Sequence, residues 1–290
     1  MNNTKRARLA LIFSMATFGT LAPFVRNISV TSGELALYRA VLAAALIGVF
    51  LLVSRQSLPI RKLGKELILL LISGIAMGFN WILLFEAYKY TTVAISTLSY
   101  YFAPVIVTIV CPFLFKEKIT KRQVLCFVMS TIGLSLVIGI TNLGQGGNDA
   151  VGIAFGLGAA VLYATVILLN KFIKGIAGIH RTFLQFIAAI LVLTPYVAFT
   201  GGMHLHSLNG TGWICLLIVG LLHTGVTYCL YFSSLKELPG QEAAILSYID
   251  PLVAVIIGVL ILNEPLTWQQ MVGGAMILGF TLWNELDTSK

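Results

Sequence analysis

The sequence predicts an all-α integral membrane protein built from two inverted repeats of five transmembrane helices. Three observations lead to this fold class. Apolar residues make up 58% of the 290-residue chain and charged residues only 10%, which is more apolar surface than a soluble domain of this length can bury. Ten apolar runs are long enough to cross a bilayer. The second half of the sequence also repeats residues of the first half at a fixed spacing.

Each apolar run is expected to form a helix, because lipid offers no hydrogen-bond partners to an open backbone. Turn-forming or charged segments separate the runs, such as the glycine-rich stretch at 142–149 and Leu238-Pro239-Gly240. The connections are short, so no soluble domain is expected. The ten predicted spans are 7–26, 34–53, 66–87, 93–115, 121–140, 151–172, 181–200, 211–234, 241–262 and 268–285.

The repeat is visible in residue pairs that are each 147 positions apart. These pairs are Tyr101 and Tyr248, Pro104 and Pro251, Glu117 and Glu264, and Gln123 and Gln270. Five spans in each half is an odd number, so the second half must insert in the opposite orientation to the first. Inverted repeats of this kind are typical of secondary transporters. We therefore divide the chain into a first repeat, residues 1–145, and a second, inverted repeat, residues 146–290.

The basic residues predict the orientation of the chain in the membrane. If both termini are cytoplasmic, sixteen of the nineteen Lys and Arg residues fall in cytoplasmic segments, and only Arg26 and Lys89 fall outside. The 116–122 connection is basic, whereas its counterpart at 263–270 contains no Lys or Arg. The sequence thus predicts a multi-pass protein of the cell membrane with cytoplasmic termini. This topology accounts for the net charge of +8 without a nucleic-acid partner.

The sequence lacks the motifs that are typical of several other classes of protein. The chain has no Gly-x-x-x-x-Gly-Lys-Ser/Thr loop, no His-Glu-x-x-His and no Gly-x-Ser-x-Gly motif, which argues against nucleotide-driven pumping and common hydrolase chemistry. The four cysteines lie inside predicted spans and give neither a zinc spacing nor a disulfide framework. His204 and His206 form only a weak metal spacing in an outer loop. We expect no metal and no cofactor, and we interpret the first apolar run as a span rather than a signal peptide.

On these residues and this repeat, the chain resembles the drug/metabolite transporter superfamily, specifically its ten-helix EamA-type exporters. The resemblance covers the whole chain and is most specific at the two Pro…Glu segments, at Gly133 and Gly279, and at Arg39 within Tyr-Arg-Ala. Phe18-Gly19 departs from the Trp-Gly that is frequent in the family. The resemblance implies a central cavity lined by spans 3, 4, 8 and 9, with help from spans 1 and 6. It also implies alternating access, but it does not name the solute.

Asp250 is the leading candidate for binding the solute. An ionisable group deep in a span is costly and normally faces a cavity or a partner. Its repeat counterpart is Ala103, so the shared architecture does not need the carboxylate, and a helical wheel places Ser247 on the same stripe. Pro251 is expected to leave a backbone carbonyl free one turn earlier. We predict a site for a cationic group or a proton. The alternative is a carboxylate held by a neighbouring hydroxyl or histidine for structure alone.

His223 is the second candidate for proton coupling, because histidine titrates near neutral pH. A hydrogen-bonded core histidine is the alternative, and an Asp250–His223 couple is plausible. Tyr101 and Tyr248 point elsewhere on their helices and are predicted to pack or to bond the backbone. Rings and one carboxylate suit an organic cation or a zwitterionic amino acid. Polar and aromatic residues at similar depth complete the predicted site, namely Asn80, Trp81, Tyr100, Tyr163 and Thr227.

Arg39 and Glu86 are predicted to be structural or gating charges, and Arg39 is assigned this role in preference to a direct solute contact. It lies near the outer end of the second span, where it could snorkel outward or pair with Glu34 or Glu86. Its counterpart in the seventh span is approximately Gln185. Glu117 and Glu264 lie at helix ends and are interpreted as caps or loop anchors.

The sequence therefore predicts a secondary active transporter that exports a small organic solute, such as an amino acid, an amine or a related metabolite. Three alternatives stay open: an importer of a similar solute, a passive channel, and a membrane enzyme that uses Asp250 and His223 as acid and base. The last would need more polar groups at one depth than the sequence provides. The expected partners are the solute, protons and the bilayer. A monomer is preferred over a dimer formed through spans 5 and 10.

Overall fold

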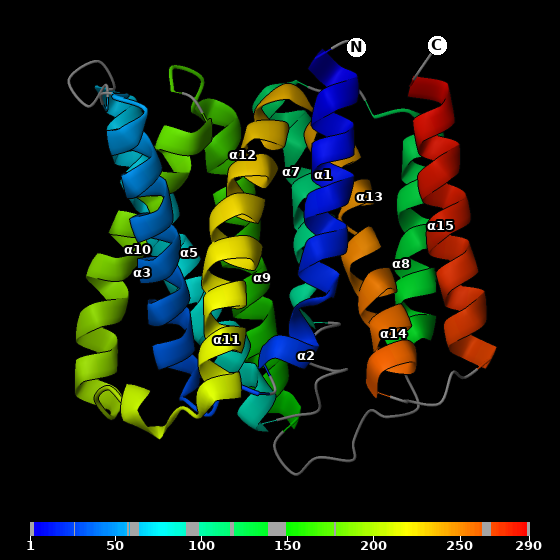
Figure 1. Cartoon of the computed structure of the whole chain (residues 1–290). Coiled ribbons are helices and arrows are strands. Elements are labelled where there is room, and N and C mark those ends of the chain that lie inside the picture. The colour runs from blue at the N-terminus through cyan, green and yellow to red at the C-terminus, as the bar shows by residue number, and fades with distance from the viewer. Residues whose placement is uncertain are drawn as a thin grey trace.

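The protein is a bundle of helices that run roughly side by side (Figure 1). The structure is a computed structural model that describes residues 3–25, 27–56, 58, 64–90, 99–116, 119–138, 149–176, 178–262 and 268–288. All regular secondary structure in these residues is helical, which confirms the predicted all-α class. The proposed division between residues 145 and 146, together with Glu117 and Glu264, lies outside the described residues.

The first half of the chain begins with a bent span. Its first part is α1 (Asn3–Gly19), and the short α2 (Leu21–Val25) follows after one residue. The remaining helices of this half are α3 (Ser32–Val53), α5 (Lys65–Tyr90), α7 (Ala103–Phe115) and α8 (Lys121–Ile138).

The second half follows the same plan. It begins with α9 (Asp149–Phe172) and α10 (Gly178–Thr200), and the short 3₁₀ turn η2 (Leu205–Ser207) lies in the loop that follows. The next span is continuous but changes geometry twice, from α11 (Gly210–Ile218) through the π-helical η3 (Val219–Val226) to α12 (Thr227–Glu237). The last helices are α13 (Gly240–Leu246), α14 (Ile249–Leu262) and α15 (Trp268–Thr288).

The two halves are inverted relative to each other, as α8 and its repeat counterpart α15 show. Arg122, at the start of α8, donates a hydrogen bond to the carbonyl of Trp283, near the end of α15, and its guanidinium lies 4.7 Å from the Trp283 ring. The two helices therefore run antiparallel and cross closely, since a Cβ added at Gly133 would lie 2.7 Å from the Gly273 carbonyl oxygen. The start of α1 and the end of α15 lie at the same face of the bundle (Figure 1).

The predicted fourth and ninth spans are interrupted, which corrects the expectation of one continuous helix in each. A turn at Tyr101-Phe102 precedes α7, and a turn at Ser247-Tyr248 separates α13 from α14. Each turn lies shortly before a proline, Pro104 or Pro251. Proline has no N–H to donate to the preceding helical turn and its ring crowds that turn, so both breaks have the same cause. Discontinuous helices of this type often border the binding sites of transporters.

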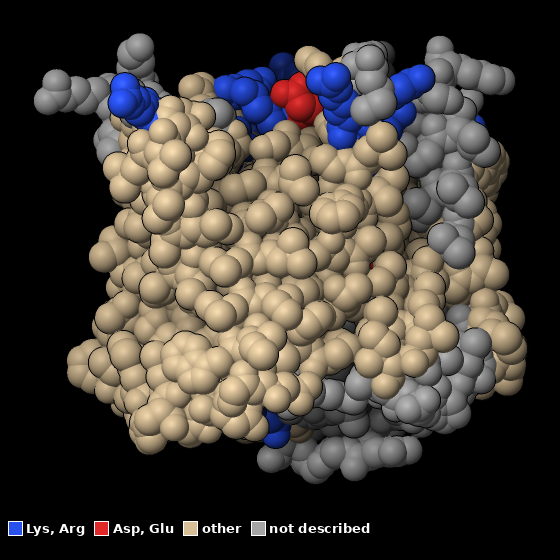
Figure 2. Space-filling view, viewed as in Figure 1, with Lys and Arg blue, Asp and Glu red and all other residues tan. Residues whose placement is uncertain are grey.

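The surface of the bundle fits a position across a membrane. Six helical segments in the described residues are long and apolar enough to span one: Asn3–Val25, Ser32–Val53, Glu66–Ala87, Ala150–Phe172, Gly178–Thr200 and Gly210–Glu237. Large apolar side chains face outward along the flank, such as Phe199, which is 89% exposed. In Figure 2 the Lys and Arg side chains gather at the face where α1 begins, and the flank below carries almost none.

Candidate solute-binding site

Five tyrosines, two of them buried and three half-buried, form a continuous cluster between the two halves, which we call the tyrosine cluster: Tyr100, Tyr101, Tyr163, Tyr228 and Tyr231. The Tyr100 ring stacks on the Tyr163 ring with centroids 5.2 Å apart, and the Tyr163 and Tyr231 hydroxyls are 2.9 Å apart. Tyr231 meets Tyr228 edge-on at 6.2 Å, and Tyr101 meets Tyr100 edge-on at 5.8 Å. The cluster combines the turn before α7 with α9 and α12, so both halves contribute to it.

Asp250 lies at one end of the tyrosine cluster, in the first turn of α14. The Tyr101 hydroxyl is within hydrogen-bonding reach of the Asp250 carboxylate. Tyr163, Tyr228 and Tyr231 are close enough to sense its charge. No basic side chain among the described residues contacts this carboxylate. Its position also suits an anion, because the start of a helix presents free N–H groups and the positive end of the helix dipole.

The backbone beside Asp250 differs in one detail from the prediction. The Ser247 carbonyl, which Pro251 cannot engage, is not free, because the Asp250 N–H donates to it at 3.3 Å. Helix α1 presses against this turn. A Cβ added at Gly19 would lie 2.5 Å from the Asp250 carbonyl oxygen, so only glycine fits there without a shift of the backbone. The preceding residue, Phe18, packs on Tyr228 with ring centroids 5.0 Å apart and closes one wall of the cluster.

Arg39 lies at the other end of the tyrosine cluster and is only 3% exposed. Its guanidinium carbon is 4.6 Å from the centre of the Trp81 ring and 5.9 Å from that of the Tyr228 ring, which are distances for cation–π attraction. Its Nε donates to the Thr224 hydroxyl at 3.0 Å, and the Tyr228 hydroxyl is within hydrogen-bonding reach. The predicted outward snorkelling of Arg39 is therefore wrong, since the side chain points into the bundle.

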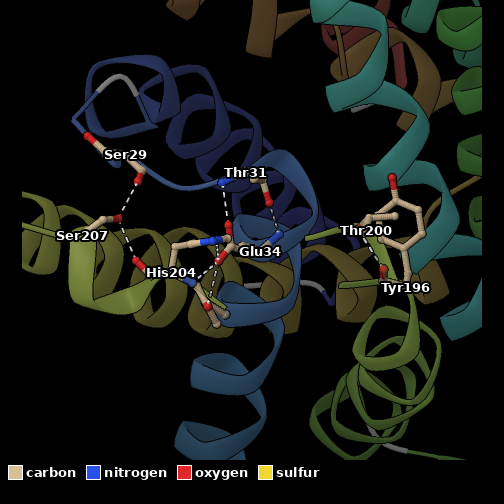
Figure 3. Close-up of polar contacts among 8 residues, drawn as sticks. Ser29, Thr31, Glu34, Tyr196, Thr200, His204 and Ser207 are labelled. Carbon is tan, nitrogen blue, oxygen red and sulfur yellow. Dashed lines mark hydrogen bonds and ion pairs between the residues drawn. The ribbon is translucent and has the colours of Figure 1, made fainter. Parts of the chain in front are cut away.

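The two carboxylates expected to pair with Arg39 are used elsewhere. Glu34 accepts hydrogen bonds from the backbone N–H groups of Thr31 and His204 and from the Tyr38 hydroxyl at 3.2 Å (Figure 3). It thus closes the capping box at the start of α3 and ties the loop after α10 to that helix end. Glu86 pairs with Lys89 three residues further along α5. Neither carboxylate contacts Arg39 in the described part of the chain.

The π-helical stretch η3 positions His223 and Thr224. A π-helix bonds to the carbonyl five residues earlier, and the Thr224 hydroxyl likewise donates to the Val219 carbonyl at 2.7 Å. His223 Nε2 lies 3.0 Å from the Thr20 hydroxyl, and its ring lies 5.1 Å from that of Phe24. The plausible couple of His223 with Asp250 is not seen. Among the described residues, His223 contacts Thr20 and the Ile218 carbonyl, and Asp250 contacts Tyr101.

Three other predicted site residues have their polar groups engaged by the backbone. Asn80 donates to the Ala159 carbonyl at 2.6 Å, the Thr227 hydroxyl to the Leu222 carbonyl at 2.9 Å, and the Ser247 hydroxyl to the Ala243 carbonyl at 2.8 Å. All three residues are buried. The structure therefore places them in helix packing around the cluster. Trp81, Tyr100 and Tyr163, in contrast, lie in or directly against it.

Sequence reasoning missed the roles of Tyr101 and Tyr228. Tyr101 was predicted to point elsewhere, yet its hydroxyl is within hydrogen-bonding reach of the Asp250 carboxylate. Tyr228 is the repeat counterpart of Trp81, and the Trp81 indole donates to the Tyr228 hydroxyl at 3.2 Å. Two residues that are related by a two-fold axis and also touch each other lie on either side of that axis. In an inverted repeat the axis lies in the membrane plane, so this contact lies midway between the two faces of the bundle.

The contacts around the axis also identify the counterpart of Arg39. Arg39 lies 4.6 Å from Trp81 and 5.9 Å from Tyr228, and Phe186 lies 5.6 Å from Tyr228 and 6.2 Å from Trp81. Arg39 is nearer to Trp81, and Phe186 is nearer to Tyr228, as two-fold symmetry requires. Phe186 is therefore the counterpart of Arg39, rather than the neighbouring Gln185 that the sequence suggested.

Comparison with known proteins identifies the chain. The sequence model of the EamA-like transporter family matches residues 5–139 and again residues 150–284. The chain belongs to the EamA-like transporter family. This family transports solutes and is not a family of enzymes, so the protein is a multi-pass membrane transporter. The double match also agrees with two related halves.

Individual relatives support the same conclusion. The chain is 30% identical to the uncharacterized transporter YxxF of Bacillus subtilis over 87% of this chain and 80% of the relative. It is 29% identical to an uncharacterized transporter of Archaeoglobus fulgidus over 95% and 96%. It is 25% identical to protein PecM of Dickeya dadantii over 83% and 80%. A solved crystal structure matches 98% of the chain and 99% of its own length with a TM-score of 0.83 at 16% identity, which supports the fold.

Proposed function

We propose that this member of the family is a secondary active transporter that exports a small organic solute, with Asp250 as the site where the cationic group of the solute and a proton compete. The observation that carries the proposal is the setting of Asp250. It is a carboxylate beside five tyrosines, at a break in a helix, with no basic side chain in contact among the described residues. A charged group at this depth costs several kcal/mol, and such residues normally face a cavity or a partner and have a function.

The tyrosine cluster suits the proposed solute. A cation near Asp250 would lie against ring faces, each of which adds roughly 0.5–2 kcal/mol of cation–π attraction. The hydroxyl groups of Tyr101, Tyr163 and Tyr231 provide hydrogen-bond partners without adding a charge. Such a site would bind amines, amino acids and related metabolites.

Competition at a single carboxylate gives a simple coupling mechanism. Asp250 can hold a proton or the cationic group of the solute, but not both, so an entering proton would displace an outgoing solute. For a solute with no net charge, a proton that moves inward through 100 mV releases about 2.3 kcal/mol. For a solute with one net positive charge the exchange is electroneutral, and the pH gradient alone supplies about 1.4 kcal/mol per pH unit. A tenfold solute gradient costs about 1.4 kcal/mol. One proton per solute is therefore enough for export, and no nucleotide is required.

Alternating access requires contacts between the halves that can open and close. At the basic face, Arg8 of α1 lies 2.5 Å from the carboxylate of Glu242 in α13, and Lys171 of α9 lies 5.0 Å from the Phe115 ring of α7. We assign this face to the cytoplasm because Lys and Arg gather there, which places both termini inside. Opening these contacts would expose the cluster to the cytoplasm. The site is complete within one chain, so a monomer is sufficient.

The test uses the purified protein in vesicles loaded with phenylalanine, tyramine or choline. An imposed pH gradient should drive at least one of these solutes against its concentration gradient, and Asp250→Asn should abolish this coupled movement. Glu237→Gln is the matched control, because Glu237 is an exposed carboxylate at the end of α12, away from the cluster. Unchanged coupled transport by Asp250→Asn would contradict the proposal. Equal flux with and without the pH gradient would identify a channel instead.

A further inference from the structure

A hollow at the basic face of the bundle lies apart from the tyrosine cluster and takes no part in the proposed transport mechanism. Its volume is about 360 Å³, and it is bordered by the first turns of α1, the start of α10 and the end of α12. The last two approach closely here, since a Cβ added at Gly178 would overlap the Ser233 hydroxyl. Because α1 belongs to the first half and α10 and α12 to the second, the hollow lies where the halves meet.

Two basic side chains from different halves line the hollow, Arg6 of α1 and Lys236 of α12. Both are exposed, and neither forms a hydrogen bond or an ion pair with another described residue. The exposed carboxylate of Glu237 also lines the hollow, so two basic side chains and one acidic side chain leave one net positive charge. A ligand with one net negative charge would neutralise this lining, whereas a highly charged polyanion would be repelled by Glu237.

The hydrogen-bond donors of the hollow suit a phosphate group. Asn3, which also lines it, begins α1, where the first N–H groups have no partner within the helix and the helix dipole is positive. The Ser233 and Ser234 hydroxyls already donate to backbone carbonyls of their own helix, at 2.6 and 2.8 Å. The remaining donors therefore come from Arg6, Lys236 and the start of α1, and such groups bind phosphate oxygens well.

The surface next to the hollow, towards the middle of the bundle, is apolar. Ala10 and Leu230 line the hollow on α1 and α12. Phe13, three residues after Ala10, is 54% exposed, and Val226, four residues before Leu230, is 43% exposed. Residues three or four apart share one face of a helix, so both apolar side chains lie below the hollow. In Figure 2 the flank below the basic face carries almost no Lys or Arg. An acyl chain fits this surface, whereas a soluble phosphate compound would not use it.

We propose that this hollow binds the headgroup of an anionic phospholipid with a glycerol-type headgroup. The phosphate lies against Arg6 and Lys236, and the headgroup hydroxyls donate to Glu237. The acyl chains then follow the apolar surface at Phe13 and Val226. Basic pockets between transmembrane helices are a general solution for holding anionic lipids. Because one cation comes from each half, the bound lipid joins α1 to α12 at the basic face.

The test measures lipid binding by the purified full-length protein in neutral detergent. The salt concentration is about 0.15 M, at which charges more than about 8 Å apart are largely screened. Phosphatidylglycerol is compared with phosphatidylcholine and with water-soluble glycerol phosphate, by native mass spectrometry and by the rise in melting temperature. Each Lys or Arg beside an anionic lipid is worth about fivefold in affinity. Phosphatidylglycerol should therefore bind at least about fivefold more tightly than phosphatidylcholine, and glycerol phosphate should bind far more weakly.

The variants separate a defined site from general attraction to a basic surface. Arg6→Gln and Lys236→Gln should each lower the affinity for phosphatidylglycerol about fivefold, and the double variant should lower it further. Lys5→Gln is the matched control, because Lys5 is the exposed neighbour of Arg6 on α1 but does not line the hollow. Its affinity should equal that of the wild type. Ala10→Phe should fill the hollow and weaken binding with both cations still in place. Melting temperatures without lipid, equal to that of the wild type, show that the variants are folded.

Three results would overturn this lipid site. Equal affinity for phosphatidylglycerol and phosphatidylcholine would remove the role of the lipid's charge. Equal losses in Lys5→Gln and Arg6→Gln would show attraction to the whole basic surface rather than binding in the hollow. Glycerol phosphate that binds as tightly as the lipid would identify a site for a soluble anion instead. None of these results depends on Asp250, so the proposed transport function is tested separately.

Discussion

Arg39 and Arg181 are both buried in the bundle, and their surroundings differ completely. Arg181 is 0% exposed and donates to three backbone carbonyls, those of Asn170, Ile173 and Phe232. Two of these acceptors belong to or follow the last turn of α9, where carbonyls have no partner within the helix. Arg39 donates to the Thr224 hydroxyl, has the Tyr228 hydroxyl within reach and packs on aromatic ring faces. Arg181 thus ties the end of α9 to α12, although its Nε has no hydrogen-bond partner among the described residues, whereas Arg39 lies against the tyrosine cluster.

The largest expected effect is on stability, at Arg181. Arg181→Leu leaves three buried carbonyls without their donor, and hydrogen bonds from a charged group are each worth about 1.5–3 kcal/mol. We expect a loss of about 3 kcal/mol or more in the free energy of unfolding, measured by denaturant titration in detergent. The protein that remains folded should bind solute with wild-type affinity. A stable Arg181→Leu variant with impaired solute binding would argue against a purely structural role for Arg181.

Gly19 should show the next largest effect, because it lies where α1 touches the turn that carries Asp250. A Cβ there would meet the Asp250 carbonyl oxygen at 2.5 Å and the Val253 Cβ at 2.7 Å. Gly19→Ala should cost about 1–3 kcal/mol through overpacking and should lower transport in vesicles. Gly279→Ala is the control, since a Cβ at Gly279 has open space around it. Equal transport by the two variants would argue against a tightly packed α1–α14 contact.

Arg39→Gln should have a smaller effect on stability than either of these. The substitution loses the charged hydrogen bond to Thr224 and the ring contacts, but it also removes the cost of a desolvated cation, so we expect a net change of less than about 1 kcal/mol in the free energy of unfolding. The melting temperature in detergent, measured without ligand, checks this value. A loss as large as that of Arg181→Leu would show that Arg39 supports the fold.

The most local effect is expected at Glu34. Glu34→Gln weakens the capping box of α3 and the link to His204, and such contacts are worth about 1 kcal/mol. Hydrogen exchange should rise in the loop around η2, while solute affinity stays the same. Ser207→Ala, which removes a single hydroxyl that donates to the Ser29 carbonyl, should produce a weaker version of the same change. A large loss of solute affinity in Glu34→Gln would link this loop to the site.

The sequence was sufficient to predict most of the fold. Hydrophobic runs and the 147-residue spacing predicted the two inverted halves, and several helix bounds repeat at that spacing, as in α8 and α15, which begin at Lys121 and Trp268. Asp250 could be predicted as well, because a lone carboxylate in an apolar span has few structural uses. The breaks before α7 and α14 were missed. An apolar run gives no other sign of a turn than its proline, and the proline was not interpreted as a break.

The site was predicted less completely because a helical wheel assumes one unbroken α-helix. The turn at Ser247-Tyr248 changes the helical rotation between Ser247 and Asp250, so the two side chains do not share one helix face as predicted. The π-helical η3 shifts the phase again before Thr227. Tyr101 was misplaced for the same reason, since it lies in the turn before α7. The inward direction of Arg39 depends on Thr224, which is 185 residues away in sequence.

The contact between Trp81 and Tyr228 on the two-fold axis has a consequence for how cargo crosses the membrane. In a symmetric pair of halves, a molecule at the axis would meet the same groups whichever way round it entered. Here the counterpart of Arg39 is Phe186 and that of Asp250 is Ala103, so neither charge has a symmetry-related copy in the other half. If Asp250 binds the solute as proposed, a bound molecule would be held in a single direction while the halves exchange conformations around it. It should leave the protein with the same end leading every time, without tumbling on the way.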